Sequence, residues 1–369
     1  MKRVLVLILC ACNLFIVGAK DKLPKKEEVK AVMTKVADWQ CEQPLTHSVA
    51  DWVNGALYAG MMEWANMAEN DKYVDWLLKR GNQANWSKSK RSNWDAKYHA
   101  DDYVVGIMYL EMFRREKQPK MLLPMRDHLD RMLSAPSKRS LDHNWWRMEG
   151  PGERWTWCDA LFMAPTVWAK MFRITGERKY LDFMYSEYKA TTDFLYDQVE
   201  HLYYRDSRYF HQKEPNGKKM FWGRGNGWVF GGLPIILEEL PDKYTEKMWF
   251  EKLFTDMAAK IASLQDKNGY WHASMLDQVS YPNPETSCSG FFVYGLAWGI
   301  NNGYLDREKY LPIVLKGWKA LTKAVYPNGK LGWVQPIGEN PVSTTKDMTE
   351  LYGVGAFLFA GTEVYKLAE

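Results

Sequence analysis

The sequence contains few of the residues that build metal centres and disulfide frameworks. Its 369 residues include five cysteines and seven histidines, with no CxxC, HExxH or clustered His/Cys spacing, which are the patterns typical of zinc and redox sites. Cys41, Cys158 and Cys288 lie beyond the N-terminal apolar run and are far apart. An odd number of cysteines cannot all pair within one chain. We therefore predict neither a metal site nor a disulfide framework.

A strong excess of charge of either sign is also absent. The chain has 49 Lys and Arg against 45 Asp and Glu, a formal net charge of +4. Proteins that bind nucleic acids or anionic membrane surfaces usually carry a larger basic excess on the binding face. This near balance therefore argues against a nucleic-acid partner and against a polybasic membrane contact.

Apolar runs are short, and the one at the N-terminus has the features of a secretory signal. Met1-Lys2-Arg3 precedes an apolar run over Val4–Val17, which ends in Gly18-Ala19, a charged start and small-residue end typical of such signals. We predict cleavage after Ala19 and export to the periplasm, with loss of Lys2 and Arg3 lowering the formal charge from +4 to +2. Acylation at Cys12 is the alternative, and it would anchor the protein to a membrane.

Aromatic residues, by contrast, are abundant. They make up 15% of the chain, including 18 Trp and 21 Tyr. Tyr and Trp present a flat apolar face with a polar edge, so a surplus suits a wall that stacks sugar rings. Core filling is the alternative role, and we expect it for most of these residues.

Six segments nearly without charge recur along the chain, separated by charged amphipathic segments. Helices that are apolar all round belong inside a protein, and one-sided helices belong outside. A polar residue marks the start of each apolar segment, and successive markers are 50 to 67 residues apart, enough for two helices and two loops. These markers are Asp51, Asp101, Asp159, Asn226, Ser287 and Glu350. The period indicates repeated helical hairpins.

Six hairpins with buried inner helices can close on themselves. We therefore predict an all-α fold, an (α/α)6 barrel formed as a single domain over residues 20–369. An open helical solenoid is the alternative, but its end repeats are normally polar caps, whereas Trp52–Ala56 and Leu351–Gly355 are as apolar as the middle repeats. Asn268-Gly269 and Asn328-Gly329, 60 residues apart, predict equivalent tight turns between helices.

Asp159 is the acid with the most unusual surroundings. It lies between Trp155-Thr156-Trp157 and the start of a buried helix at Ala160. Apolar surroundings raise the pKa of a carboxyl group, which can then hold a proton to donate near neutral pH. A helix N-cap is the alternative role, and there the pKa would be lowered. The adjacent Cys158 has no dedicated base or cation to activate it, so we expect a small buried side chain rather than a nucleophile.

If the inner helices all begin at one end of the barrel, their leading polar residues meet in one cleft. That cleft would contain His99, Asp101, Asp102, Asp159 and the run Trp222–Trp228 with Arg224 and Asn226. An arginine for a carboxylate, aromatic faces for stacking and two separated acids for proton transfer favour an acidic sugar as the ligand. Structural roles remain the alternative for His99, for Asp102 as a cap and for Arg224 in an ion pair.

Three motifs carry a resemblance to a known family. They are Tyr98-His99-Ala100-Asp101-Asp102, Trp155-Thr156-Trp157-Cys158-Asp159-Ala160-Leu161-Phe162-Met163 and Trp222-Gly223-Arg224-Gly225-Asn226-Gly227-Trp228. In this order and spacing the chain resembles glycoside hydrolase family 105, the unsaturated rhamnogalacturonyl hydrolases, from roughly Trp52 to Tyr365. The resemblance implies an (α/α)6 barrel with no metal and no cofactor.

The resemblance also implies an unusual hydrolysis. The family acts on oligosaccharides left by polysaccharide lyases, whose non-reducing-end uronate carries a C4=C5 double bond. The acid matching Asp159 protonates C4 and assists the addition of water at C5, after which the ring opens and the remaining sugar is released. No glycosyl-enzyme intermediate forms, so the carboxylate-spacing rule for ordinary glycosidases does not apply.

The same resemblance assigns roles to the other motif residues. Asp101 matches a second acid that contacts the sugar and assists Asp159, and Arg224 matches a substrate-binding arginine. The stacking positions and the further expected substrate contacts are Trp157, Trp222, Trp228, His99, Asp102 and Asn226. The expected partner is an oligosaccharide bearing an unsaturated uronate.

Two segments depart from the family pattern. No histidine stands within Leu202–Arg208, where Arg205 or Arg208 would bind the sugar instead, and Arg147 in the loop before Asp159 has no assigned role. Three other functions remain open. They are an unsaturated glucuronyl hydrolase of the neighbouring family, a non-catalytic acidic-sugar-binding protein, and a helical-repeat scaffold.

Overall fold

The computed structural model describes residues 22–89, 99–143 and 154–369. Several features discussed above lie outside these residues: the signal sequence with Cys12, the motif residue Tyr98, and the loop containing Arg147. Within the described residues, no helix is both long enough and apolar enough to cross a membrane.

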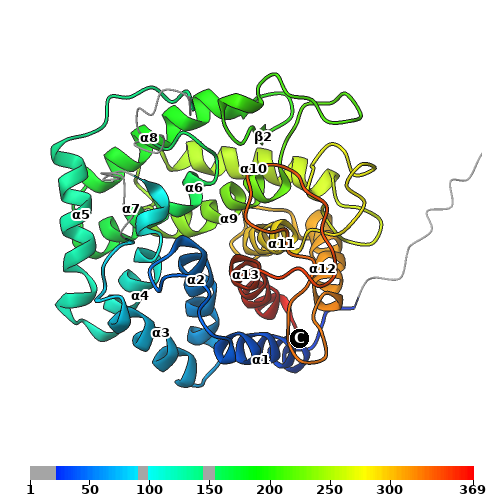
Figure 1. The fold of residues 1–369 in the computed structure, drawn as a ribbon, viewed down its shortest axis with the longest axis horizontal. Helices are drawn as coiled ribbons and strands as arrows, with labels where there is room; N and C mark the ends of the chain where they lie inside the picture. Colours follow the sequence, from blue (N-terminus) through cyan, green and yellow to red (C-terminus); the bar gives the residue numbers. More distant parts are fainter. Residues whose placement is uncertain (1–21, 90–98, 144–153) are drawn as a thin grey trace, which may run out of the picture.

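Two concentric sets of helices form the structure (Figure 1). The inner helices are α2 Trp52–Met67, α4 Gly106–Glu116, α6 Ala160–Met163 with α7 Pro165–Thr175, α9 Gly223–Glu239, α11 Thr286–Asn301 and α13 Leu351–Leu367. The outer helices are α1 Lys26–Glu42, α3 Lys72–Gln83, α5 Leu123–Ser134, α8 Lys179–Leu195, α10 Lys247–Ser263 and α12 Arg307–Lys323. The predicted (α/α)6 barrel is confirmed, and each inner helix overlaps one of the six apolar segments.

The inner helices close into a ring because the last packs against the first. Each one contacts its neighbours in chain order, and α13 contacts both α11 and α2. At that closure Gly60 of α2 meets Gly355 of α13 so closely that a Cβ atom on either glycine would overlap backbone atoms of the other helix. The apolar end repeats are therefore buried against each other, and the open solenoid is wrong.

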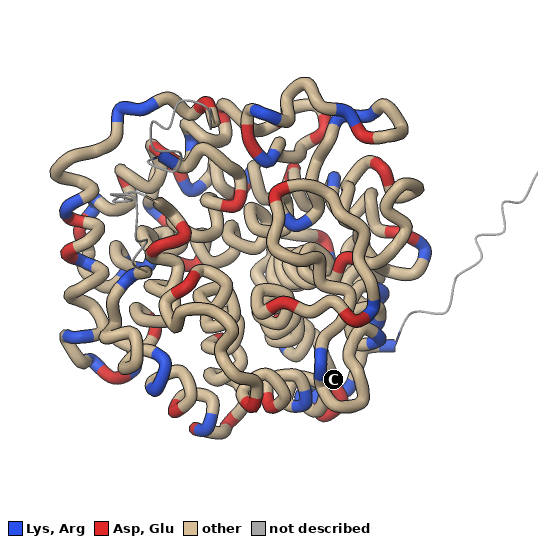
Figure 2. The backbone as a smooth tube through the Cα atoms, viewed as in Figure 1, with Lys and Arg blue, Asp and Glu red and all other residues tan. Residues whose placement is uncertain are grey.

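Burial follows the two kinds of helix. In α11 every residue from Thr286 to Ile300 is buried, whereas outer helix α3 buries only Tyr73, Val74, Leu77 and Gly81, which share one face. Charged residues accordingly lie mainly on the outer helices and loops (Figure 2). This segregation is what a double-layered helical barrel requires, since only the outer layer meets water.

Short elements connect the helices. Those on the side where the inner helices begin are the 3-10 turns η1 Ala100–Tyr103 and η4 Ser207–Tyr209 and the antiparallel strands β1 Tyr196–Asp197 and β2 Leu202–Tyr203, whereas η2 Pro119–Met121 joins the end of α4 to the start of α5. Pro165 starts α7 and separates it from α6, because a proline lacks the N–H that would continue the helix. Gly269 and Gly329 have φ of 96° and 98°, as the predicted Asn-Gly turns after α10 and α12 require.

Candidate active site

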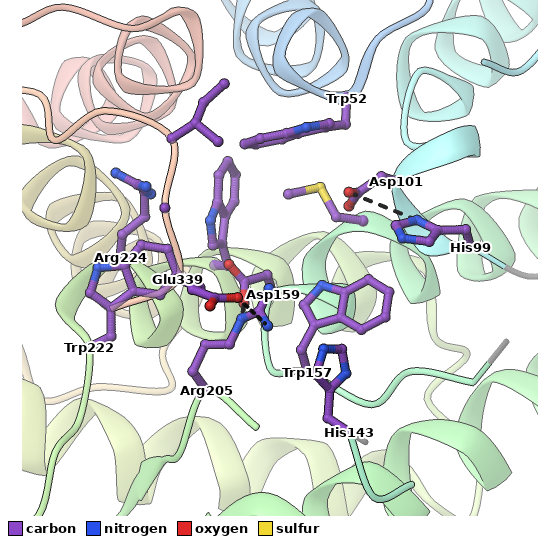
Figure 3. Close-up of a pocket in the computed structure, with 14 residues that line it drawn as sticks. Trp52, His99, Asp101, His143, Trp157, Asp159, Arg205, Trp222, Arg224 and Glu339 are labelled. Atoms are coloured by element: carbon purple, nitrogen blue, oxygen red, sulfur yellow. Dashed lines mark ion pairs between the residues drawn. The ribbon is translucent and has the colours of Figure 1, made fainter. Parts of the chain in front are cut away.

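A pocket of about 310 Å³ opens where the inner helices begin (Figure 3). Its lining combines aromatic side chains with three acids and two arginines, which is the composition expected of a site for an acidic sugar. The lining residues are Trp52, His99, Asp101, His143, Trp157, Asp159, Met163, Arg205, Trp222, Arg224, Trp228, Ile337, Gly338 and Glu339. The predicted cleft therefore exists, and it brings together seven of the nine expected site residues.

Asp159 lies directly before α6 and is 8% exposed. It occupies the N-cap position of α6, but its side chain makes no capping hydrogen bond to the helix, so the stabilising role of a cap is not what this geometry provides. Burial raises the pKa of the Asp159 carboxyl, while the nearby Arg205 guanidinium opposes that rise without cancelling it. The position thus gives a carboxylic acid with an increased tendency to hold a proton, next to a fixed cation.

Cys158 supports Asp159 and does not act as a nucleophile. Its Sγ lies 3.7 Å from Asp159 Oδ2, and its backbone N–H donates to the carbonyl oxygen of Arg205 at 2.8 Å. Burial raises the pKa of the Cys158 thiol well above its usual value, and the Asp159 charge adds to this rise. A thiol that stays protonated is a poor nucleophile.

His99 and Asp101 form the wall opposite Arg205. His99 Nδ1 lies 3.9 Å from Asp101 Oδ2, and the His99 ring lies 5.0 Å from the Trp157 ring. Asp101 sits in η1 rather than in α4, with its side chain 18% exposed toward the pocket. The second acid is therefore placed across the pocket from Asp159, as Figure 3 shows.

Two expected substrate contacts lie outside the lining. The Asp102 carboxylate is 1% exposed and lies 3.6 Å from Lys88 Nζ. The Asn226 amide is fully buried, accepting from Tyr203 N at 2.8 Å and donating to the carbonyls of Tyr203 and Trp222. The prediction that Asp102 and Asn226 contact the substrate is corrected by these positions, which give both residues structural roles.

The predicted tryptophans line the pocket together with one that the sequence pattern did not single out. Trp157, Trp222 and Trp228 are each less than 5% exposed, so only parts of their rings face the pocket. Trp52 stacks on Tyr352 with ring centroids 5.5 Å apart and meets Trp228 edge-on at 6.3 Å. Trp52 directly follows the marker residue Asp51, and this position in the sequence could have identified it as a lining residue.

Arg224 has a different role from the one expected. Its guanidinium lies between the rings of Trp222 and Tyr352, 4.5 and 4.6 Å from their centroids. Nη1 donates to the carbonyl oxygen of Gln335 at 2.7 Å, and Nη2 donates to that of Pro336 at 2.8 Å. Both terminal nitrogens thus hold a loop, and the expected bidentate contact with a substrate carboxylate is not what this geometry provides.

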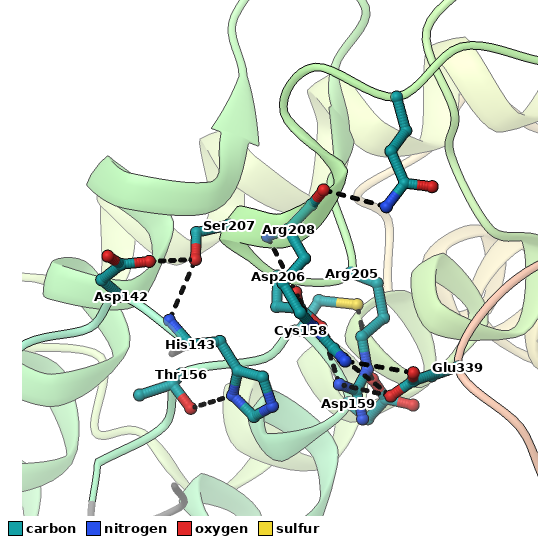
Figure 4. A network of polar contacts seen from close by, with 11 residues as sticks. Asp142, His143, Thr156, Cys158, Asp159, Arg205, Asp206, Ser207, Arg208 and Glu339 are labelled. Carbon is teal, nitrogen blue, oxygen red and sulfur yellow. Dashed lines mark hydrogen bonds and ion pairs between the residues drawn. The ribbon is translucent and has the colours of Figure 1, made fainter. Parts of the chain in front are cut away.

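Arg205 supplies the cation that the sequence assigned mainly to Arg224. Its Nε lies 3.3 Å from Asp159 Oδ2, and its Nη1 contacts Asp206 Oδ2 at 2.7 Å and Glu339 Oε2 at 3.4 Å. Figure 4 shows these contacts with Arg208, which also pairs with Asp206 and Glu339. No sequence pattern indicated Glu339 as a site residue, because it lies in an ordinary polar loop.

His143 is a further lining residue that sequence reasoning missed. Its Nδ1 lies 3.1 Å from Thr156 Oγ1, and its backbone N–H donates to Ser207 Oγ at 2.9 Å. Burial lowers the pKa of the His143 imidazole to about 4, so the ring is neutral near pH 7. The segment Leu202–Arg208 therefore has a histidine beside it, supplied by a distant loop.

Comparisons with known proteins agree with this geometry. A family model described as Glycosyl Hydrolase Family 88 matches residues 24–368. The unsaturated 3S-rhamnoglycuronyl hydrolase of Formosa agariphila is 39% identical over 353 residues, covering 93% of this chain and 92% of that protein. A solved structure named a polysaccharide lyase is 33% identical with a TM-score of 0.82, covering 93% of this chain and 98% of its own.

The barrel also occurs in a solved structure described as a possible member of the GH105 family from Salmonella enterica. It is 16% identical with a TM-score of 0.74, and the match covers 98% of this chain and 100% of that one. The predicted resemblance to the unsaturated rhamnogalacturonyl hydrolases is confirmed, since families 88 and 105 are related. The chain belongs to Glycosyl Hydrolase Family 88 and is a glycoside hydrolase of the unsaturated uronyl type.

Proposed function

We propose that the protein removes the unsaturated uronate from the non-reducing end of lyase-generated oligosaccharides in which the next sugar is rhamnose. The observation that carries the proposal is the placement of Asp159, a buried acid 3.3 Å from Arg205 at the base of an aromatic pocket. The relatives' name supports rhamnose as the neighbouring sugar.

The chemistry follows from a protonated Asp159. The carboxylic acid donates its proton to C4 of the vinyl ether, and positive charge develops at C5 and the ring oxygen. The resulting carboxylate takes a proton from water as the water oxygen bonds to C5, which restores the acid. The C5–ring-oxygen bond of this hemiketal then breaks, leaving a ketone at C5 and a hemiacetal at C1 that releases the remaining sugar.

The other lining residues position the sugar. Asp101 lies across the pocket, where its carboxylate is placed to accept a hydrogen bond from a sugar hydroxyl, and His99 is beside it. Trp157, Trp222 and Trp52 supply the apolar faces on which a pyranose ring can stack. Proton transfer by one acid and orientation by a second give this site separate parts for chemistry and binding.

The test follows the ultraviolet absorbance of the conjugated C4=C5 uronate. Unsaturated oligosaccharides from rhamnogalacturonan, from rhamnose–glucuronate polymers and from glycosaminoglycans are incubated with wild type, Asp159→Asn and Asp193→Asn. Asp193 is an exposed acid paired with Lys189 and is the matched control. We expect absorbance to fall with wild type and the control, and to persist with Asp159→Asn, whose amide cannot supply the proton.

Each rival predicts a different absorbance. A lyase, as one related structure is named, would raise the absorbance of intact polymer instead of lowering that of the oligosaccharides. A sugar-binding protein would leave it unchanged while still binding the oligosaccharides. Faster loss with the glycosaminoglycan products would favour an unsaturated glucuronyl hydrolase, whereas preference for the pectic rhamnogalacturonan products would make pectin the source of the substrate.

We further propose that the protein is exported to the periplasm and that its leader is removed after Ala19. The composition of the first 19 residues supports this, with basic residues at the start, an apolar body and a small-residue end. N-terminal sequencing of the protein from a periplasmic extract is expected to begin at Lys20. A mature chain that begins at an acylated Cys12 in the membrane fraction would contradict the proposal.

A further inference from the structure

Arg205 of the pocket lining and its neighbour Arg208 share two acids that come from different parts of the chain. Asp206 follows Arg205 directly, whereas Glu339 lies in the loop before α13. Arg205 Nη1 contacts Asp206 Oδ2 at 2.7 Å and Glu339 Oε2 at 3.4 Å. Arg208 Nη2 contacts the same two oxygens at 2.8 and 2.7 Å. Each arginine is therefore held between one local and one distant carboxylate (Figure 4).

The two acids differ in how firmly they are held. Asp206 is fully buried, and it accepts further hydrogen bonds from the backbone N and Nε of Arg208 at 3.0 and 2.9 Å. Burial alone would raise the pKa of Asp206, but the hydrogen bond from Arg208 and the charge of Arg205 outweigh it and keep that pKa below its usual value. Asp206 is thus a permanent charged anchor that orients both guanidinium groups.

Glu339 has the opposite character. Its side chain is 40% exposed, and within the described residues it forms ion pairs with Arg205 and Arg208. The loop that carries Glu339 is fixed at its start, where Tyr352 and Arg224 donate hydrogen bonds to the Gln335 carbonyl oxygen. Further along the loop Ile337, which lines the pocket, is 51% exposed. Water can replace part of these contacts because Glu339 is 40% exposed, whereas Asp206 is fully buried. Of the two acids, Glu339 is therefore the one that can leave the arginines more easily.

The position of Arg205 identifies what would replace Glu339. In the proposed reaction Asp159 protonates C4, and the carboxylate of the unsaturated uronate is attached to the neighbouring C5. The cation that receives this carboxylate must accordingly lie beside the proton donor. Arg205 meets this requirement, since its Nε is 3.3 Å from Asp159 Oδ2 and its Nη1 is 3.4 Å from Glu339 Oε2.

We propose that the Glu339 carboxylate occupies the place of the substrate's own carboxylate, and that the uronate displaces it from Arg205 and Arg208 on binding. The inference rests on the proposed function for the identity of the anion. The charges agree with an exchange, because with Asp159 protonated the two arginines face two charged acids, Asp206 and Glu339, and a further carboxylate would leave the group with an excess negative charge. Glu339 then acts as a specificity residue, since a neutral sugar cannot displace it from the arginines.

The test compares ligands that differ only in the carboxylate. Binding of methyl glucuronide and of methyl glucoside is measured calorimetrically with wild type and with Glu339→Gln. The variant retains the shape of the side chain but not the competing charge. We expect it to bind the glucuronide roughly two- to fivefold more tightly, the range set by an exposed ion pair, with no change for the glucoside. Equal or weaker glucuronide binding would overturn the proposal.

A matched control removes a similar ion pair elsewhere. Glu177 is 35% exposed and contacts Arg126 at 2.6 Å on the outer layer, far from the pocket lining. Glu177→Gln is expected to bind both ligands as wild type does. If it bound the glucuronide as tightly as Glu339→Gln, the gain would reflect overall charge, and the exchange at Arg205 would be rejected.

Kinetics separate this proposal from the proposed function and from a purely structural role. With unsaturated oligosaccharides, Glu339→Gln is expected to lower KM by the same roughly two- to fivefold while kcat changes less than twofold. An inactive wild type that still shows the calorimetric difference would refute the reaction but retain the exchange. An active wild type with an unchanged or higher KM in the variant would refute the exchange alone.

The same kinetics identify the anion that displaces Glu339. A lower KM of the variant confined to substrates carrying sulfate on the next sugar would identify that sulfate as the anion and refute the assignment to the carboxylate.

Discussion

Arg205 Nε lies 3.3 Å from Asp159 Oδ2, so the acid at the base of the pocket has a cation fixed beside it. Two opposing effects therefore act on the pKa of the Asp159 carboxyl. Burial raises the pKa of Asp159, and Arg205 restrains the rise by stabilising the carboxylate. The same arginine contacts Glu339, which links the charge state of the acid to whatever anion the arginine binds.

The first prediction concerns pH. Because Asp159 must be protonated to donate, kcat/KM is expected to fall as pH rises through its raised pKa. Arg205→Met removes the restraining cation, so the alkaline limb of the kcat/KM profile is expected to move to higher pH while the maximum falls. Profiles of wild type, Arg205→Met and the outer-layer control Arg126→Met test this. An unmoved limb in Arg205→Met would show that Asp159 does not control it.

The second prediction concerns Arg224. Arg224→Lys keeps the charge but cannot donate to the carbonyls of both Gln335 and Pro336 from a planar group. Loss of these buried hydrogen bonds is expected to cost about 1–3 kcal/mol of stability and to raise KM, because the loop bearing Glu339 loses its anchor. Thermal melts and steady-state kinetics measure both effects. A higher KM with an unchanged Tm would instead mean that Arg224 binds the substrate directly.

The third prediction concerns closure of the barrel. A Cβ atom on Gly355 would overlap the backbone carbonyl of Ala56 in α2, which cannot move aside as the end of a flexible side chain could. Gly355→Ala is therefore expected to push α13 from α2 and to lower the unfolding free energy by about 1–3 kcal/mol or more. Urea denaturation of wild type and variant measures the loss. Wild-type stability in the variant would mean that the two helices do not meet as closely as the structure shows.

The fourth prediction concerns Glu63, a half-buried residue of α2. Burial raises the pKa of its carboxyl to about 7, with the charge of Lys170 opposing the rise. Between its ordinary pKa of about 4.3 and pH 7, the unfolded chain ionises Glu63 while the folded protein keeps it protonated, so this group lowers stability as pH rises. Glu63→Gln removes the titration and is expected to gain about 1–3 kcal/mol at pH 8 but little at pH 4.5.

Denaturation curves at both pH values check this fourth prediction. Glu69→Gln is the control, because Glu69 lies beyond the C-terminal end of α2, is 82% exposed and pairs with Lys30. The control is expected to show no gain at pH 8. An equal gain for Glu63→Gln at both pH values would rule out titration as its cause.

The fold was predictable because its signal repeats along the chain. Charge-free and amphipathic segments alternate six times. The composition of each segment indicates whether its helix faces the core or the solvent, so the inner helices coincide with the charge-free segments. The burial of Asp159 was predictable for a similar reason, since its aromatic and apolar neighbours in sequence are buried with it. The reaction was inferred from the resemblance of the three motifs to a known family, because a pattern of hydrophobicity does not indicate a reaction.

The tertiary structure decided which of several neighbouring polar residues face the pocket. Asp101 lines it and Asp102 does not, because consecutive residues of the 3-10 turn η1 point in different directions. Arg224 and Asn226 are two apart in α9 and therefore lie on different faces of the helix, one against the loop of Gln335 and the other against β2. The Arg205–Glu339 contact joins residues 134 positions apart. Such contacts depend on how the closed ring brings its loops together, and no local pattern in the sequence encodes that.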